Sequence, residues 1–173
     1  MLIVMAGLPG TGKSAVAQKL RDRLGYPMIS VDTIEEAILS AGIDDDQPTG
    51  LAAYLVAEAL ASGVLESERS VNIDAVNADS PARDQWVALA ERYGDAITFV
   101  EVVCSDPAVL RKRLEERHRT QAHANDASWH AVEQSLDEYD EWVGPAAEAD
   151  RITLDSVEPL PTIVDKALVF IEN

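Results

Sequence analysis

Hydrophobic residues along the chain occur in short unbroken runs that alternate with longer segments of mixed apolar and polar positions. Short unbroken runs are typical of strands buried on both faces, whereas the mixed segments have the spacing of amphipathic helices. The runs predict strands at 2–6, 27–31, 70–74, 97–104 and 151–154. The mixed segments predict helices at 14–24, 33–41, 50–62, 80–93, 107–119, 128–143 and 161–171. This alternation predicts an α/β fold with a parallel sheet.

Polar residues and glycines predict where several of these helices begin and end. Ser80 and the pair Asp106-Pro107 are placed to open helices, because such residues cap the first backbone N–H groups and proline suits the first turn. Thr49 is predicted to cap the helix over 50–62. Gly63 is predicted to end it.

Composition agrees with one globular domain over residues 1–173. Apolar residues make up 47% of the chain and charged residues 26%, which is ordinary for such a domain. No unbroken apolar run approaches the length of about 18 residues that a membrane span needs, so no membrane association is expected. Cys104 is the single cysteine, which excludes an internal disulfide. A cytoplasmic location is the expectation, and the sequence carries no signal for an oligomeric state.

The net charge is −17, with a pI near 4.3, and it limits the possible partners. A protein this acidic repels nucleic acid and anionic membranes, so a nucleic-acid partner is unlikely. The acidic residues are spread along the chain, which favours solubility as their role over a dedicated acidic patch. An anionic ligand therefore needs a local positive site.

Such a site is predicted directly after the first strand. The sequence there matches G-x-x-x-x-G-K-[ST] in full, with Gly7, Leu8, Pro9, Gly10, Thr11, Gly12, Lys13 and Ser14. In this pattern glycines turn backbone N–H groups towards phosphate oxygens, lysine reaches the β- and γ-phosphates, and the hydroxyl ligates magnesium. A glycine-rich turn without a ligand is the alternative, but the preceding strand and following helix are the context that favours nucleotide binding. We expect ATP and Mg²⁺ here, with Lys13 as a catalytic residue.

Asp32 is the first candidate for the chemical step. It follows the second predicted strand, and the carboxyl ends of parallel strands line the ligand crevice. We expect Asp32 to face the γ-phosphate and the acceptor, as a base for an acceptor hydroxyl or as a holder of a magnesium-bound water. The alternative is an N-cap of the helix that begins at Thr33.

Three further candidate residues lie at or just after the end of the third predicted strand. Asp74 is placed as a carboxylate for the magnesium shell, with a turn-forming aspartate as an equal alternative. Asn77 and Arg83 lie beyond it on the same edge and are candidate acceptor-binding residues. A surface arginine is the alternative for Arg83.

Basic residues cluster in one helix. Residues 111–119 contain five of the chain's 14 lysines and arginines, and Arg113 and Arg117 lie four apart on one face. We predict a lid at about 113–130, in which Arg113 binds the nucleotide and Arg113 and Arg117 stabilise the transferred phosphoryl group. An exposed helix whose arginines pair with nearby acids is the alternative.

Together, the glycine motif, Asp32, the stretch from Asp74 to Asn77 and the arginines of 111–119 resemble the P-loop AAA-type ATP-binding kinases. This group is similar to the kinase domain of polynucleotide kinase, gluconate kinase, chloramphenicol phosphotransferase and zeta toxin. The resemblance implies a three-layer sandwich around a five-stranded parallel sheet in the order 2-3-1-4-5, with a small helical lid. It also implies Asp32 as the catalytic base and a segment near 155–159 that borders the adenine.

Three functions remain open from the sequence. The first is an ATP-dependent kinase that phosphorylates a hydroxyl of a small molecule, the second a polynucleotide 5′-hydroxyl kinase, and the third a nucleotide-binding switch without an acceptor. The acceptor is expected between residues 33 and 62, which hold scattered acids and no cationic cluster. This composition indicates a neutral or cationic acceptor.

Overall fold

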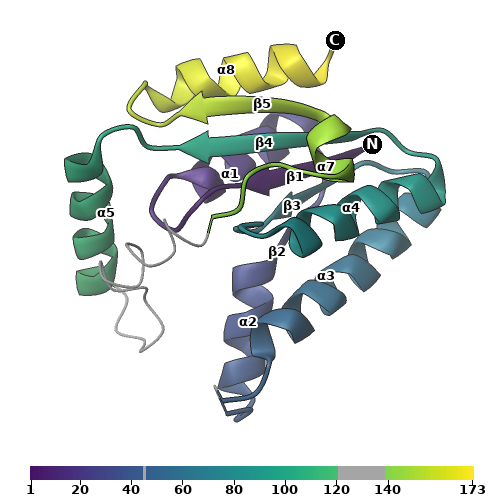
Figure 1. Ribbon diagram of the computed structural model, residues 1–173, viewed down its shortest axis with the longest axis horizontal. Helices are drawn as coiled ribbons and strands as arrows, with labels where there is room; N and C mark the ends of the chain where they lie inside the picture. The colour runs from purple at the N-terminus through teal and green to yellow at the C-terminus, as the bar shows by residue number, and fades with distance from the viewer. Residues whose placement is uncertain (45, 121–138) are drawn as a thin grey trace.

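The computed structural model describes residues 1–44, 46–120 and 139–173, with side chains up to residue 116 and from residue 139. The described strands form one parallel sheet in the order β2-β3-β1-β4-β5, which confirms the predicted order (Figure 1). The strands are β1 (Leu2–Ala6), β2 (Met28–Ser30), β3 (Val71–Asp74), β4 (Ile97–Val103) and β5 (Asp150–Asp155). Each residue of the central strand β1 is fully buried, as its unbroken apolar run requires.

Helices cover both faces of the sheet and produce the predicted three layers (Figure 1). They are α1 (Lys13–Leu24), α2 (Val31–Ser40), α3 (Thr49–Glu66), α4 (Ser80–Tyr93), α5 (Pro107–Thr120), α7 (Pro145–Glu148) and α8 (Leu160–Ile171). One core cluster joins α1 and α8 to the side chains of Ile3 and Met5. The other joins α3 and α4 to Leu2 and Val4. The alternation of side chains along β1 therefore supplies both halves of the core.

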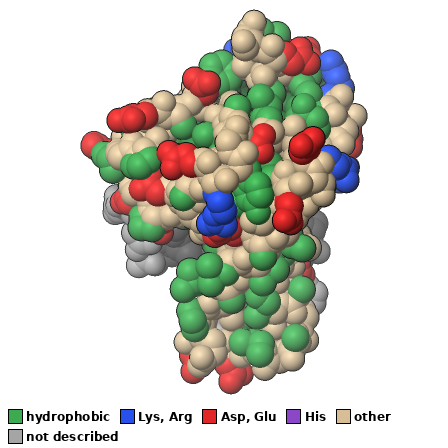
Figure 2. Space-filling model, turned by 90° about the vertical axis from the view of Figure 1, so that its right-hand side faces the viewer, with side chains coloured by type: hydrophobic (Ala, Val, Ile, Leu, Met, Phe, Trp, Pro, Cys, Tyr) green, Lys and Arg blue, Asp and Glu red, His purple; other side chains and the backbone are tan. Residues whose placement is uncertain are grey.

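Helix α2 and the start of α3 pack against each other as an arm that projects beyond the end of β2, and α3 then runs back to pack beside α4 (Figure 1). The inner face of α3 is buried through Ala53, Ala57, Ala61 and Leu65. Its outer face exposes an apolar stripe, which we define as Leu51, Leu55, Val56 and Leu60. Apolar side chains cover much of this arm in the view from its side (Figure 2).

The apolar composition of α3 bears on the expectation that the protein does not associate with a membrane. Among the described residues, it is the one helix whose length and apolar composition would suffice to cross a bilayer. In this structure its inner face is part of the domain core, and a helix with one face in a core passes the same test of length and composition.

Several predicted boundaries differ from the structure. The N-cap of α4 is Asp79 and not Ser80, because the Asp79 carboxylate accepts a hydrogen bond of 2.8 Å from the backbone N–H of Ala82. Helix α3 begins at Thr49 itself and runs through Gly63 to Glu66, since its packing on the core outweighs the weak helix propensity of one glycine. Of the helix predicted at 128–143, residues 139–143 are not helical and residues 128–138 lie outside the described part of the chain.

Candidate active site

The glycine motif forms the loop between β1 and α1. Gly7, Gly10 and Gly12 have φ values of 139°, 81° and 98°, where a side chain is disfavoured. A Cβ atom on Gly7 would lie 2.3 Å from the carbonyl oxygen of Val102, so the loop sits too close to β4 for any larger residue. The loop is closed by a hydrogen bond of 2.8 Å from the Thr11 hydroxyl to the Leu8 carbonyl. The shape of the loop is therefore fixed by its glycine conformations, its close approach to β4 and the Thr11 hydroxyl.

The loop leads directly into the N-terminus of α1, where the N-cap residue is Gly12. Within the described part of the chain, no side chain caps this terminus and no acid lies in the first turn. The first N–H groups of a helix lack helical partners and carry partial positive charge. Lys13, the first residue of α1, adds a full charge and is 4% exposed. These donors fit the phosphates of a nucleoside triphosphate.

Asp32 lies next to this cradle. The Oδ2 atom of Asp32 is 3.5 Å from the Nζ atom of Lys13, although the two residues are 19 positions apart. Asp32 lies in the first turn of α2, but the helix is capped by Ser30, whose hydroxyl accepts a hydrogen bond from the backbone N–H of Thr33. Ser30 and not Asp32 is therefore the N-cap of α2, which leaves the Asp32 carboxylate available for another role. The Asp32 carboxylate is 44% exposed, so a proton on a bound molecule can reach it.

Side chains with oxygen ligands for a cation lie near the carboxyl ends of the strands, where Asp32 also lies. Asp74 ends β3, is 3% exposed, and lies opposite Ser30 in the pairing of β2 with β3. Ser14 follows Lys13 in α1. Among the described residues, no three His, Cys, Asp or Glu side chains cluster as a metal site. Magnesium commonly takes only one or two carboxylates beside water and phosphate oxygens, so the hydroxyl of Ser14 with Asp32 and Asp74 fits it chemically.

The prediction that Asn77 and Arg83 contact the acceptor is wrong. Both side chains are completely buried. The Asn77 amide donates to the Met5 carbonyl at 2.7 Å and accepts from the indole N–H of Trp86 at 2.9 Å. The Arg83 guanidinium donates to the carbonyl groups of four residues, Asn77, Ala78, Asp140 and Glu141. A buried guanidinium needs all its donors satisfied, so Arg83 holds these segments together.

The predicted lid residues have different outcomes. Arg113 reaches the phosphate loop, where its guanidinium donates to Ser156 Oγ and O at 2.8 Å each and to the Thr11 carbonyl at 3.4 Å. These contacts make Arg113 a residue that positions the loop and the turn after β5. Its contact with a phosphoryl group stays a prediction. The side chain of Arg117 and residues 121–130 of the predicted lid lie outside the described residues.

Sequence reasoning missed a buried carboxylate. Glu101 interrupts the apolar strand β4 and is 7% exposed. Its carboxylate accepts hydrogen bonds from Tyr139 and Trp142 at 2.9 Å and from Thr153 at 2.7 Å. Burial alone would raise the pKa of Glu101, but these three donors and the nearby Arg151 guanidinium lower it below its ordinary value. The signal in the sequence was a lone acid inside an apolar run.

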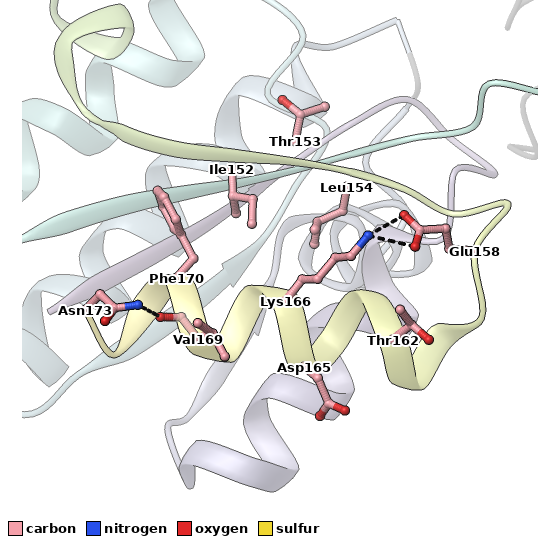
Figure 3. A pocket seen from close by; sticks show the side chains of 10 residues that line it. All are labelled: Ile152, Thr153, Leu154, Glu158, Thr162, Asp165, Lys166, Val169, Phe170 and Asn173. Atoms are coloured by element: carbon pink, nitrogen blue, oxygen red, sulfur yellow. Dashed lines mark hydrogen bonds and ion pairs between the residues drawn. The ribbon is translucent and has the colours of Figure 1, made fainter.

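A surface groove lies apart from this site, between β5 and α8 (Figure 3). Lys166 crosses it and donates to both carboxylate oxygens of Glu158 at 2.7 Å, so its charge is already paired. Strand β5 is the outermost strand on one side of the sheet, whereas Asp32 follows β2, the outermost strand on the other side. The groove therefore does not belong to the site around Lys13.

Comparison with known proteins places the chain in a family. A family model described as an AAA domain matches residues 2–142. The chain belongs to this family. It is a kinase-like P-loop protein with the fold that the resemblance implied.

Individual relatives are distant but span the whole domain. An adenylate kinase from Stenotrophomonas maltophilia is 27% identical over 192 residues, covering 100% of each chain. A gluconokinase structure from Sinorhizobium meliloti is 25% identical with a TM-score of 0.64, covering 98% of this chain and 90% of the other. A sugar kinase structure from Janibacter has a TM-score of 0.73 at 19% identity, covering 99% and 94%, and this likeness concerns the fold alone.

Proposed function

We propose that this protein transfers the γ-phosphoryl group of ATP to a hydroxyl group of a small molecule. The observation that carries the proposal is the distance of 3.5 Å between the Lys13 ammonium and the Asp32 carboxylate at the phosphate loop. Lysine in this loop attracts the β- and γ-phosphates. A carboxylate beside it is within reach of an acceptor that approaches the γ-phosphate.

The residues have separate roles in this proposal. The N–H groups of the loop and the Lys13 ammonium hold the phosphates and offset their charge. Asp32 takes the proton of the acceptor hydroxyl, and the oxygen of that hydroxyl forms a bond to the γ-phosphorus. The bond between the γ-phosphorus and the β,γ-bridging oxygen breaks at the same time, which releases ADP. Ser14 and Asp74 would hold Mg²⁺, which neutralises phosphate charge when bound, and Asp32 would contact the ion through a bound water molecule.

Other functions have less support. A polynucleotide 5′-hydroxyl kinase needs a basic channel, and the net charge of −17 opposes one. A switch without an acceptor would not need the exposed carboxylate of Asp32 beside Lys13. The adenylate kinase relative makes a nucleotide phosphate the second candidate acceptor.

The test is ADP release from Mg-ATP with a panel of acceptors. The panel holds sugars, nucleosides, aminoglycosides, chloramphenicol, a 5′-hydroxyl oligonucleotide and AMP. We expect release to rise with a hydroxyl acceptor, to be lost in Lys13→Ala, and to persist in Lys166→Ala, whose lysine lies at the far edge of the sheet. A response to AMP alone would favour the second candidate, and confirmed ATP binding with no response would favour the switch.

A further inference from the structure

The side of the site that would receive the acceptor is strongly acidic. In the sequence, residues 31–68 contain no lysine or arginine. The same segment contains nine acids, of which Asp32, Glu35 and Glu36 lie in α2 and Asp44, Asp45 and Asp46 follow it in the sequence. Of the other three, Glu58 pairs with Arg92, and Glu66 and Glu68 lie at the far end of α3, before the start of β3. The segment includes α2, which begins with Asp32 in its first turn, and α3, which begins beside α2 and completes the arm (Figure 1). Acceptors that enter between this arm and Lys13 therefore meet negative charge.

Two of these acids face the same way. Asp32 and Glu35 are three positions apart in α2, so their side chains share one face of the helix. The Glu35 carboxylate is also held in place, because its Oε1 atom accepts a hydrogen bond of 2.8 Å from the hydroxyl of Thr49 at the start of α3. Thr49 itself is 7% exposed. Glu35 is thus a fixed group near the root of the arm.

Tyr54 in α3 shows how closely the charges converge. Its hydroxyl accepts a hydrogen bond of 3.1 Å from the backbone N–H of Asn77. Burial raises the pKa of Tyr54 to about 12, and the negative charges of Asp32, Asp79 and Glu35 act in the same direction. The negative charges of carboxylates from α2 and from the start of α4 therefore act together on one phenol group.

The cations described near this face are already engaged. Lys13 is assigned to the nucleotide phosphates and contacts Asp32. The guanidinium of Arg83 is enclosed by backbone carbonyl groups. Arg113 donates to Thr11 and Ser156, on the other side of the phosphate loop from α2. A second phosphate beside Asp32 and Glu35 would face carboxylates of like charge, which disfavours binding.

We propose that the acceptor carries a protonated amine beside its hydroxyl group and carries no phosphate. This inference rests on the proposed function, whose phosphate loop and Asp32 define where the acceptor lies. In such a complex the hydroxyl faces Asp32 and the ammonium group is attracted by Glu35 and Asp79. The same charges exclude AMP, although a relative of this chain is an adenylate kinase.

Matched ligand series test the charge preference. We would measure binding by calorimetry in the presence of Mg²⁺ and a non-hydrolysable ATP analogue. One series is glucosamine, glucose and glucose 6-phosphate, and the other is 3′-amino-3′-deoxyadenosine, adenosine and AMP. We expect the amine to bind at least tenfold more tightly than the neutral compound, and the phosphate most weakly, in at least one series. Equal binding throughout both series, or a phosphate that binds most tightly in either, would overturn the inference.

Two variants test whether Glu35 is the source of the preference for an amine. Glu35→Gln should weaken binding of the amine about tenfold and leave the affinity for the ATP analogue unchanged. Asp165→Asn removes an equal charge from α8, where Asp165 pairs with Arg23, and should change neither affinity. Equal losses in both variants would mean that the amine responds only to net charge, which contradicts the proposal. Transfer is measured separately, so an amine preference without ADP release would contradict the proposed function while this inference stands.

Discussion

The ammonium of Lys13 lies 3.5 Å from the carboxylate of Asp32 and joins the phosphate loop to the first turn of α2. The two side chains differ greatly in exposure, at 4% for Lys13 and 44% for Asp32. The buried cation suits a fixed role in holding phosphate, whereas the exposed carboxylate suits exchange of a proton with an incoming molecule. This ion pair therefore joins the two groups that the proposed transfer assigns to the phosphates and to the acceptor proton.

Asp32→Asn should abolish transfer and preserve nucleotide binding. The amide has nearly the same shape but cannot take a proton from the acceptor hydroxyl. Loss of general base catalysis typically costs about 10²–10⁴-fold in kcat. We would measure kcat with the best acceptor and the Kd for ATP by calorimetry. Glu36→Gln, which changes an exposed acid in the same helix, is the control, and full activity in Asp32→Asn would exclude the base role.

Gly7→Ala should destabilise the protein and weaken ATP binding. The new Cβ would lie 2.3 Å from the Val102 carbonyl oxygen, at a φ of 139° that side chains avoid. Backbone strain of this kind costs about 1–3 kcal/mol, and the steric overlap adds to it. Thermal unfolding and ATP titration would report both effects.

Gly63→Ala is the matched control for that substitution. Gly63 lies inside α3, and nothing from the rest of the protein lies within 4 Å of the place that a Cβ atom would take there. Alanine at this position should stabilise the helix by about 0.5–1 kcal/mol. If Gly7→Ala unfolds at the same temperature as the wild type, the tight approach of the phosphate loop to β4 is not important for stability.

Arg83→Ala should destabilise the fold strongly without altering acceptor preference. The substitution removes the donor to the buried Asn77 carbonyl and to the partly buried carbonyls of Ala78, Asp140 and Glu141, together with the guanidinium that lies 4.3 Å from the centre of the Trp142 ring. We expect a loss of about 3 kcal/mol, within the range for breaking a buried charged network. Arg92→Ala, at an exposed position, should have little effect. A selective rise in the KM of the acceptor at unchanged stability would restore the acceptor-binding role.

Glu101 should make stability fall in acid. Because its pKa in the folded protein lies below the ordinary value of 4.5, its carboxylate contributes stability above that value. The contribution is lost as the pH falls through the lower, folded pKa. Glu101→Gln should lower the free energy of unfolding at pH 7 by about 2 kcal/mol and flatten the decline below pH 4.5. Urea titrations from about pH 3 to pH 7 would show this, with the exposed Glu91→Gln as control, and an unchanged acid slope would contradict it.

The sheet and its main helices could be predicted because their signals are local. The apolar run of β1 reports burial on both faces, and Asp106 before Pro107 marks the start of α5, where its carboxylate accepts from the N–H of Ala108 at 2.8 Å. The end of α3 could not be predicted in the same way. Gly63 is a helix-ending residue by its own preference, and only packing on the core carries the helix past it.

The phosphate loop of the site could be predicted because its residues follow a fixed motif, whereas the positions of Arg83 and Glu101 could not. The loop before Lys13 has one workable geometry, so its residues could be placed from the sequence. The sequence does not distinguish an Arg83 exposed on its helix from one in the core, because its carbonyl partners at 140–141 lie far along the chain. Glu101 is likewise explained only by donors from other segments.

The apolar stripe on α3 should make self-association of this acidic protein depend on the salt concentration. Copies with a net charge of −17 repel one another in dilute buffer, where the screening length is about 10 Å at 0.1 M salt. At 1 M salt that length shrinks to about 3 Å, while the attraction between apolar faces such as Leu51 and Leu55 persists. Concentrated salt should therefore promote self-association of this protein, and Leu55→Lys should suppress it.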